Sequence, residues 1–180
     1  FLYKLIIIVI FINFIQIAKS SEQFEFNVTE IEILENGNLY KGLKRGKIVS
    51  DDGTVLTADN FIYKKLTNVL TAEGNVEIKD DINNIRIFAD KITYKKNEEI
   101  IITEGNSKAI DSNQVIIAEK FTYNKILKIL NAKNDVKIEN KQDDYLIETE
   151  ELTYLKKEGK IFTTGNTKAI IESKYQIESK

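Results

Sequence analysis

The chain has 180 residues, with 26 Lys and Arg against 28 Asp and Glu, so its formal net charge is −2 at neutral pH. It contains no His, Cys, Met, Trp or Pro. This composition excludes disulfides, thiolate or imidazole metal sites and a Cys or His catalytic group. It also disfavours nucleic acid as a partner, because a mildly acidic chain without a basic cluster does not attract phosphates.

Residues 1–20 predict a secretory signal peptide. Lys4 precedes an apolar run of 13 residues that only two amide side chains interrupt, and an Ala-Lys-Ser sequence then predicts cleavage after Ser20. An uncleaved anchor is the alternative, since residues 1–17 approach the ~20 residues that span a bilayer. In either case the remainder of the chain is expected to leave the cytoplasm.

Residues 21–54 predict an irregular first unit of the domain 21–180. Alternating apolar residues from Phe24 to Ile33 indicate short strands, and residues 35–38 indicate a turn. Residues 47–50 predict a further strand, followed by an Asp-Asp-Gly hairpin turn. We interpret this part as a degenerate repeat, because terminal repeats cap a stack and depart from its pattern.

A 25-residue unit then recurs four times without an internal gap, at residues 55–79, 86–110, 115–139 and 146–170. One tyrosine marks the same place in every copy, with spacings of 31, 29 and 31 residues. These residues are Tyr63, Tyr94, Tyr123 and Tyr154. A fixed period of about 30 residues predicts stacked units that share one core.

Each unit predicts a bent hairpin. Apolar residues alternate within four short segments, which is the periodicity of strands with one buried face. The step of three from Ala58 to Phe61 reverses this alternation, so it predicts a bulge that bends the strand. The return leg breaks at Gly74-Asn75, residue types that accept positive φ. Stacked bent hairpins predict an all-β fold, a folded antiparallel β-jellyroll of two facing sheets that is open at both ends.

The inward positions of this pattern predict an apolar interior. They are Leu56, Ala58, Phe61, Tyr63, Leu70, Ala72, Val76, Ile78, Ile87, Ala89, Ile92, Tyr94, Ile101, Ile116, Ala118, Phe121, Tyr123, Leu130, Val136 and Ile138. We interpret the tyrosines as core residues whose hydroxyls reach the backbone of the hairpin tips.

The charged residues of the repeat favour no active site. A carboxylate recurs at each bend, at Asp59, Asp90, Glu119 and Glu150. A calcium ladder would require Gly/Asp nonapeptides, which are absent, so these acids are interpreted as solvated corners. Lysine pairs at 64–65 and 95–96 are interpreted as tip charges that keep edges soluble. No nucleophile elbow, phosphate loop or dinucleotide motif occurs, so we expect no enzyme, no cofactor and no metal site.

The sequence LTADNFIYKK, followed after a short tip by LTAEGNVEI, resembles the OstA-like domain of the lipopolysaccharide-transport family. The resemblance is carried by Ala58-Asp59, Tyr63, Ala72 and Gly74-Asn75-Val76, and by the same places in the second copy. The third and fourth copies depart from it at Asn134-Asp135 and Thr149-Glu150.

This resemblance implies a component of lipopolysaccharide transport at the periplasm and outer membrane. The inward residues named above would line a groove that shields the acyl chains of lipid A. Other jellyroll proteins of the same pathway would be partners by strand addition, with Phe24, Phe26 and Val28 as the candidate edge.

Residues 176–180 read as the start of a fifth repeat, which favours the N-terminal part of an LptD-like protein whose C-terminal barrel would reach the outer membrane. The absence of cysteine argues against that assignment, and an LptA-like protein is the alternative. A β-solenoid adhesin or structural protein without lipid transport is a second alternative.

Overall fold

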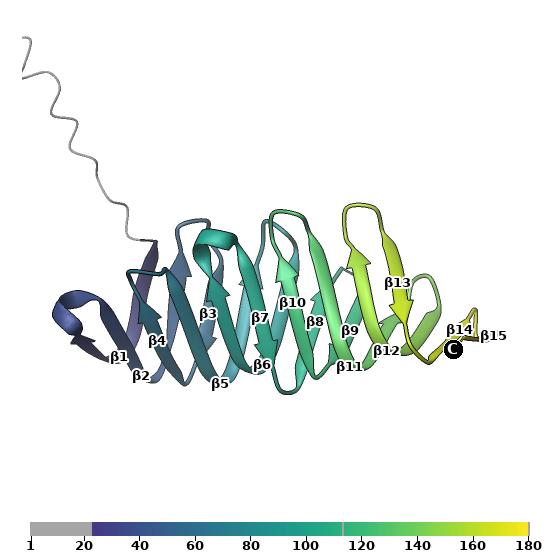
Figure 1. Ribbon diagram of the computed structural model, residues 1–180, viewed down its shortest axis with the longest axis horizontal. Helices are drawn as coiled ribbons and strands as arrows, with labels where there is room; N and C mark the ends of the chain where they lie inside the picture. The colour runs from purple at the N-terminus through teal and green to yellow at the C-terminus, as the bar shows by residue number, and fades with distance from the viewer. Residues whose placement is uncertain (1–22, 113, 180) are drawn as a thin grey trace, which may run out of the picture.

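The computed structural model describes residues 23–112 and 114–179, so the predicted signal peptide lies outside the described residues. Fifteen strands form one hydrogen-bonded sheet in which every pairing is antiparallel. Figure 1 shows them stacked along the long axis of the molecule, from β1 at one end to β15 at the other. The all-β, jellyroll prediction is confirmed.

The strands are β1 (Phe24–Leu34), β2 (Leu39–Ser50), β3 (Val55–Ala58), β4 (Asn60–Lys64), β5 (Val69–Asp80), β6 (Ile85–Lys95), β7 (Ile100–Glu104), β8 (Ser107–Asp111), β9 (Gln114–Ala118), β10 (Lys120–Asn124), β11 (Ile129–Asn140), β12 (Tyr145–Leu155), β13 (Lys160–Thr164), β14 (Thr167–Ile171) and β15 (Tyr175–Ser179). Two short 3-10 turns, η1 (Glu35–Gly37) and η2 (Lys96–Glu98), lie at hairpin tips. Within the described part of the chain, no helix is long and apolar enough to cross a bilayer.

Each of the four regular units has one unbroken leg and one leg divided at the bend. The unbroken legs β5, β6, β11 and β12 have 11 or 12 residues. The divided legs are the pairs β3–β4, β7–β8, β9–β10 and β13–β14. The register between β5 and β6 shifts between Glu73 and Val76, which is the bulge that the sequence predicts. Leu56 and Tyr63, on either side of one bend, are buried in the same core, so the reversal of the alternation does bend the strand.

Backbone conformation makes the bend possible. Gly74 and Asn75 have φ of 80° and 47°, and Gly105 and Asn106 have φ of 73° and 45°. Glycine adopts this left-handed region without a steric cost, and asparagine adopts it more readily than most residues. The two residue types therefore occur where the sheet must turn over.

A carboxylate holds the two legs together at every bend. The backbone N–H of Asp59 donates to the carbonyl oxygen of Gly74 at 2.9 Å, and the Asn75 side-chain amide donates to the Asp59 carboxylate at 2.7 Å. The amides of Asn106, Asn134 and Asn166 make the same contact with the next three bend acids, each at 2.8 Å. The interpretation of these acids as merely solvated corners was therefore incomplete, because they are structural hydrogen-bond acceptors.

The irregular first unit uses different residues for the same geometry. Lys44 and Arg45 of β2 have φ of 62° and 56°, and the Arg45 N–H donates to the carbonyl oxygen of Asp59 at 2.8 Å. The Arg45 guanidinium also contacts the Asp59 carboxylate at 2.8 Å. Hydrogen bonds from Asn75 and then from Arg45 lower the pKa of Asp59. The first unit thus joins the stack through an acid of the second unit.

Replacing Gly74 tests how closely the bend is packed. A Cβ at Gly74 would lie 2.6 Å from an Asp59 carboxylate oxygen, whereas a Cβ at Gly53, with a similar φ of 83°, would meet no atom within 4 Å. We expect Gly74→Ala to lower the free energy of unfolding by about 1–3 kcal/mol more than Gly53→Ala does, because only the first also displaces the carboxylate. Urea unfolding of the two variants measures this difference, and equal losses would contradict the close packing.

Candidate functional site: the interior and mouth of the folded sheet

The fold encloses a continuous apolar interior. Cross-strand neighbours such as Leu70 with Tyr94 and Ile78 with Ile87 place their side chains inside it. All the residues that the sequence predicts to face inward are buried and belong to one core. The interior therefore extends through all the regular units and is filled by its own side chains.

The first end of this interior is covered by aromatic rings. Phe24 meets Tyr63 edge-on at 5.0 Å between ring centroids, and Phe26 stacks on Tyr40 at 5.7 Å. Of the three candidate edge residues, Phe24 is buried, whereas Phe26 and Val28 are half-buried against the core. β1 pairs only with β2 among the described strands, and its register shifts between Val28 and Glu30. This edge therefore carries a bulge that the sequence pattern did not indicate.

The mouth of the fold is the side opposite the bends. One lip, the tip lip, consists of the hairpin tips at 64–68, 95–99, 124–128 and 155–159. The other, the turn lip, consists of the turns that begin at Ser50, Asp80, Asp111 and Asn140. Main-chain hydrogen bonds join successive tips, from the N–H of Lys96, Lys125 and Lys156 to the carbonyl oxygens of Asn68, Glu99 and Lys128 at 3.0, 2.9 and 3.0 Å.

A row of ion pairs made by largely buried lysines joins the two lips. Lys96 contacts Asp51 at 3.0 Å, Lys125 contacts Asp80 at 3.2 Å, and Lys156 contacts Asp111. The partners in each pair are 45 residues apart in the chain, so one contact recurs in three successive units. The three lysine side chains are only 7%, 6% and 16% exposed. We call these three pairs the ionic seam.

Lys125 is the centre of the seam. Its ammonium lies 2.6 Å from an Asp52 carboxylate oxygen and 2.6 Å from the hydroxyl of Thr54, in addition to Asp80. It also lies 3.6 Å from Glu99 and 5.4 Å from the centroid of the Tyr94 ring. A buried ammonium is tolerated only where such partners replace its hydration, and here three carboxylates do so.

The pKa shifts of two groups at the seam, Asp52 beside Lys125 and Lys96 itself, both favour the charged form. Burial alone would raise the pKa of Asp52, but the hydrogen bonds from Lys125 and Thr54 outweigh it and hold that pKa far below its usual range. Burial alone would lower the pKa of Lys96, but Glu99 and Asp51 outweigh it and raise that pKa. Both groups are therefore ionised at neutral pH.

The tyrosine ladder lies directly beneath the seam. Its hydroxyls meet side chains rather than the backbone predicted from the sequence. Tyr94 donates to Glu99 at 2.5 Å and Tyr154 donates to Asp111 at 3.1 Å. The hydroxyl of Tyr123, between these two in the ladder, is buried and has no hydrogen-bond partner. Burial, first, and the neighbouring carboxylates raise the pKa of Tyr94, Tyr123 and Tyr154.

Sequence reasoning missed the seam. The interpretation of Lys95-Lys96 as a solubilising tip charge was wrong for Lys96, which is buried. The signal that could have found it is a lysine two residues after the tyrosine of every copy. These residues are Lys65, Lys96, Lys125 and Lys156. Only Lys65, in the first copy, is exposed.

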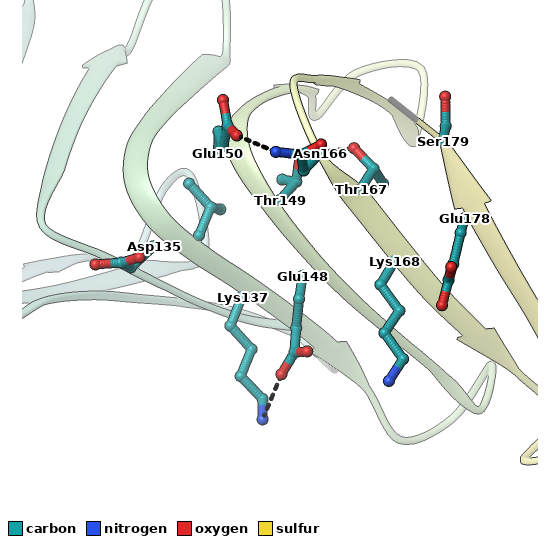
Figure 2. A pocket seen from close by; sticks show the side chains of 11 residues that line it. Asp135, Lys137, Glu148, Thr149, Glu150, Asn166, Thr167, Lys168, Glu178 and Ser179 are labelled. Atoms are coloured by element: carbon teal, nitrogen blue, oxygen red, sulfur yellow. Dashed lines mark hydrogen bonds and ion pairs between the residues drawn. The ribbon is translucent and has the colours of Figure 1, made fainter.

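Two hollows accompany this site, and most of the residues that line them are charged or polar. Figure 2 shows a cavity of about 820 Å³ near the last units, where Lys137 contacts Glu148 and Glu150 accepts from Asn166. A smaller cavity of about 330 Å³ opens at the end of the seam. It is lined by Asp111, Ser112, Gln114, Asn140, Asp143, Tyr154 and Lys156.

The described residues hold no group of three or more acidic side chains arranged to bind a metal ion.

What the fold and the site define is a β-jellyroll of stacked bent hairpins around an apolar interior. Residues 24–180 match the family model of OstA-like proteins, and the chain belongs to that family. This membership confirms the resemblance seen in the sequence and supports the interpretation that the chain is not an enzyme.

Among solved structures, the fold is similar to the crystal structure of LptH from Pseudomonas aeruginosa, described as the LptA-homologous periplasmic component of the conserved lipopolysaccharide transport device. The two chains are 18% identical, with a TM-score of 0.55, and the match covers 62% of this chain and 82% of LptH. No curated protein matches this sequence.

Replacing Lys125 tests the energy of the seam. We expect Lys125→Met to lower the free energy of unfolding by about 3–5 kcal/mol, because it leaves the buried Asp80 carboxylate without its lysine partner. Lys133→Met is the matched control, since Lys133 and its partner Glu151 are 56% and 49% exposed, and its loss should be below about 1 kcal/mol. Urea unfolding measures both, and similar small losses would show that the seam contributes little.

Acid should weaken the seam through Asp52. Because folding lowers its pKa from the ordinary value of 3.8, its ionisation stabilises the fold above that pH, and this contribution is lost as the pH falls further. The free energy of unfolding should therefore fall more steeply between pH 4 and pH 2 in the unmodified protein than in Asp52→Asn. Asp135→Asn, which alters an exposed acid, is the control and should keep the steep dependence.

Proposed function

We propose that this protein carries lipopolysaccharide toward the outer membrane, enclosing the acyl chains of lipid A between the two layers of its folded sheet. The observation that carries the proposal is the continuous apolar interior of an OstA-like jellyroll. Acyl chains must be shielded from water, and an interior lined by aliphatic and aromatic side chains is the environment that shields them.

The fold match supports the same function. LptH is the periplasmic component of a lipopolysaccharide transport device, and it shares this fold over most of its own length. We therefore propose the periplasm as the location and lipopolysaccharide, together with other components of such a device, as the partners. Within this family we propose two assignments, the N-terminal part of an LptD-like protein and an LptA-like bridge.

We also propose strand addition as the means of joining these partners. β1 presents one side without a described strand neighbour, and an edge of that kind pairs readily with another chain. The register shift after Val28 limits the straight part of this edge to Phe24–Val28, where the pairing with β2 is regular. A partner strand is expected to dock along that part.

One observation favours a different function. The interior is filled by its own side chains, as in a β-solenoid that acts as a structural protein or adhesin without carrying a lipid. Transport requires that the layers part or that core side chains repack, whereas a structural solenoid requires neither. The two functions therefore differ in whether a lipid can reach the interior.

Photo-crosslinking from the interior separates them. An aliphatic diazirine amino acid at Ile101, which is fully buried on β7, is expected to form adducts with lipopolysaccharide. The neighbouring position Ile102 points to the opposite face and is the matched control, with few or no adducts expected. The small probe replaces an aliphatic side chain of similar shape, and a thermal melt establishes that each labelled variant is folded.

Adducts at Ile101 that exceed those at Ile102 would support transport. A folded Ile101 variant that gives no more adducts than Ile102, under conditions where LptH gives adducts from its own interior, would favour the structural solenoid instead.

A further inference from the structure

We propose that the mouth is a lateral entrance for an amphiphile with a phosphate-bearing headgroup. The ionic seam separates on entry, the acyl chains pass between the layers, and Lys96, Lys125 and Lys156 exchange their carboxylate partners for the phosphates. This inference rests on the proposed function and assigns the entry route and the headgroup site to it.

The two lips are joined differently from the bends. Main-chain hydrogen bonds run along the tip lip, and others lie at the bends, as between Asp59 and Gly74. The main-chain hydrogen bonds outside the strand ladders join no tip to a turn of the opposite lip, and the contacts that do so are made by side chains, among them those of the seam with Thr54 and Tyr154. The mouth can therefore open without breaking a strand ladder, whereas opening at the bends cannot.

Charge is distributed unevenly between the two lips. The seam lysines all lie on the tip lip, where Glu99 is the one acid beside Lys96 and Lys125, and their other partners Asp51, Asp52, Asp80 and Asp111 lie on the turn lip. Separation would leave a row of ammonium groups on one lip and a row of carboxylates on the other. Phosphate oxygens form charge-assisted hydrogen bonds with lysine and can replace the lost carboxylates.

This exchange also explains why the mouth stays closed without a ligand. Parting a buried ion pair strands two charges in a poorly hydrated place, which is strongly unfavourable. A ligand shifts the equilibrium toward the open form only if it interacts better with that form. A phosphate that pairs with the freed lysines supplies this difference, whereas an uncharged headgroup does not.

Two buried polar atoms beneath and beside the seam have no hydrogen-bond partner. The Tyr123 hydroxyl is buried without a partner, between the two tyrosines that contact Glu99 and Asp111. Gln114, whose side-chain oxygen is also buried without a partner, lines the 330 Å³ cavity beside Lys156. Buried polar groups normally find partners, so the closed mouth leaves a free hydroxyl and a free carbonyl available to a phosphorylated sugar headgroup.

Exposed aliphatic side chains form a rim around the mouth. Ile126 and Leu127 follow Lys125 in its tip and are exposed, Leu66 is exposed in an earlier tip, and Ile82 is exposed on the turn lip. Exposed aliphatic side chains on both lips would contact acyl chains before they reach the interior. The combination of apolar rim and paired lysines suits an anionic amphiphile better than a soluble anion.

A reversible lock on the mouth tests the entry route. The chain has no cysteine, so Lys156→Cys with Asp111→Cys introduces the only two thiols and removes both members of one pair. A short bis-thiosulfonate crosslinker then ties the lips together, and reductant releases them. We expect the locked protein to bind bisphosphorylated lipid A at least 10-fold more weakly than the same protein after reduction.

A second comparison tests the headgroup. The unmodified protein should bind bisphosphorylated lipid A at least 10-fold more tightly than dephosphorylated lipid A, and inorganic phosphate alone should not bind. Lys125→Gln with Asp80→Asn neutralises the central pair and should reduce that preference several-fold. Lys133→Gln with Glu151→Gln neutralises an exposed pair on the outer face and should leave the preference unchanged.

The outcomes separate the inference from the function on which it rests. Equal binding by locked and reduced protein would overturn the lateral entrance while leaving transport standing, with the lipid entering from an end. Equal binding of the two lipid A forms, or binding of inorganic phosphate alone, would overturn the headgroup site. Failure of the unmodified protein to bind either lipid would count against the proposed function itself.

Discussion

The bend of each hairpin is the constraint on which the rest of the structure depends. Without it, the stacked hairpins would form one flat sheet with an apolar face open to water. The bend requires two things at the same place, a backbone with positive φ and a contact that ties one leg to the other. Gly74-Asn75 supplies the first, and the contact of the Asn75 amide with the Asp59 carboxylate supplies the second. The acid and the amide therefore stabilise the bend together, although they are 16 residues apart in the chain.

Folding the sheet over places two kinds of side chain in contact, apolar ones in the interior and polar ones at the mouth, and the sequence stabilises each by different residues. Inside, side chains from the two layers meet, and aliphatic residues with tyrosine or phenylalanine fill the space between them. At the mouth, polar tips and turns meet over that apolar space. Their charged and hydrogen-bonding groups are partly excluded from water, so they need partners within the protein. The ionic seam supplies such partners, because each lysine reaches a carboxylate on the opposite lip. The constant spacing of 45 residues shows that the seam belongs to the repeat rather than to one accidental contact.

The sequence predicted the fold and the interior because both follow from short-range patterns. Alternation of apolar residues and its reversal between Ala58 and Phe61 fixed which side chains turn inward, and all the predicted inward residues are buried. The seam could not be predicted in the same way. Its partners depend on how far one layer is displaced along the stack relative to the other, and nothing in a single hairpin specifies that displacement. Lys125 therefore looks like an ordinary tip charge until the turn that contains Asp80 is placed opposite it.

The bends and the mouth are held by different kinds of contact, and this difference explains how a transport protein can have a filled interior. Strand ladders hold each layer together, and the contacts at the bends keep one layer folded over the other. Both are therefore expected to persist in every state of the molecule. The mouth is held differently, by buried charges whose partners are replaceable, above a tyrosine hydroxyl that has no partner. A cavity that stayed open and apolar in water would be costly, since its lining would lose packing contacts on one side. A closed, packed interior that opens only against a ligand of suitable charge avoids that cost. For this reason a filled interior and a lipid cargo are compatible in one molecule.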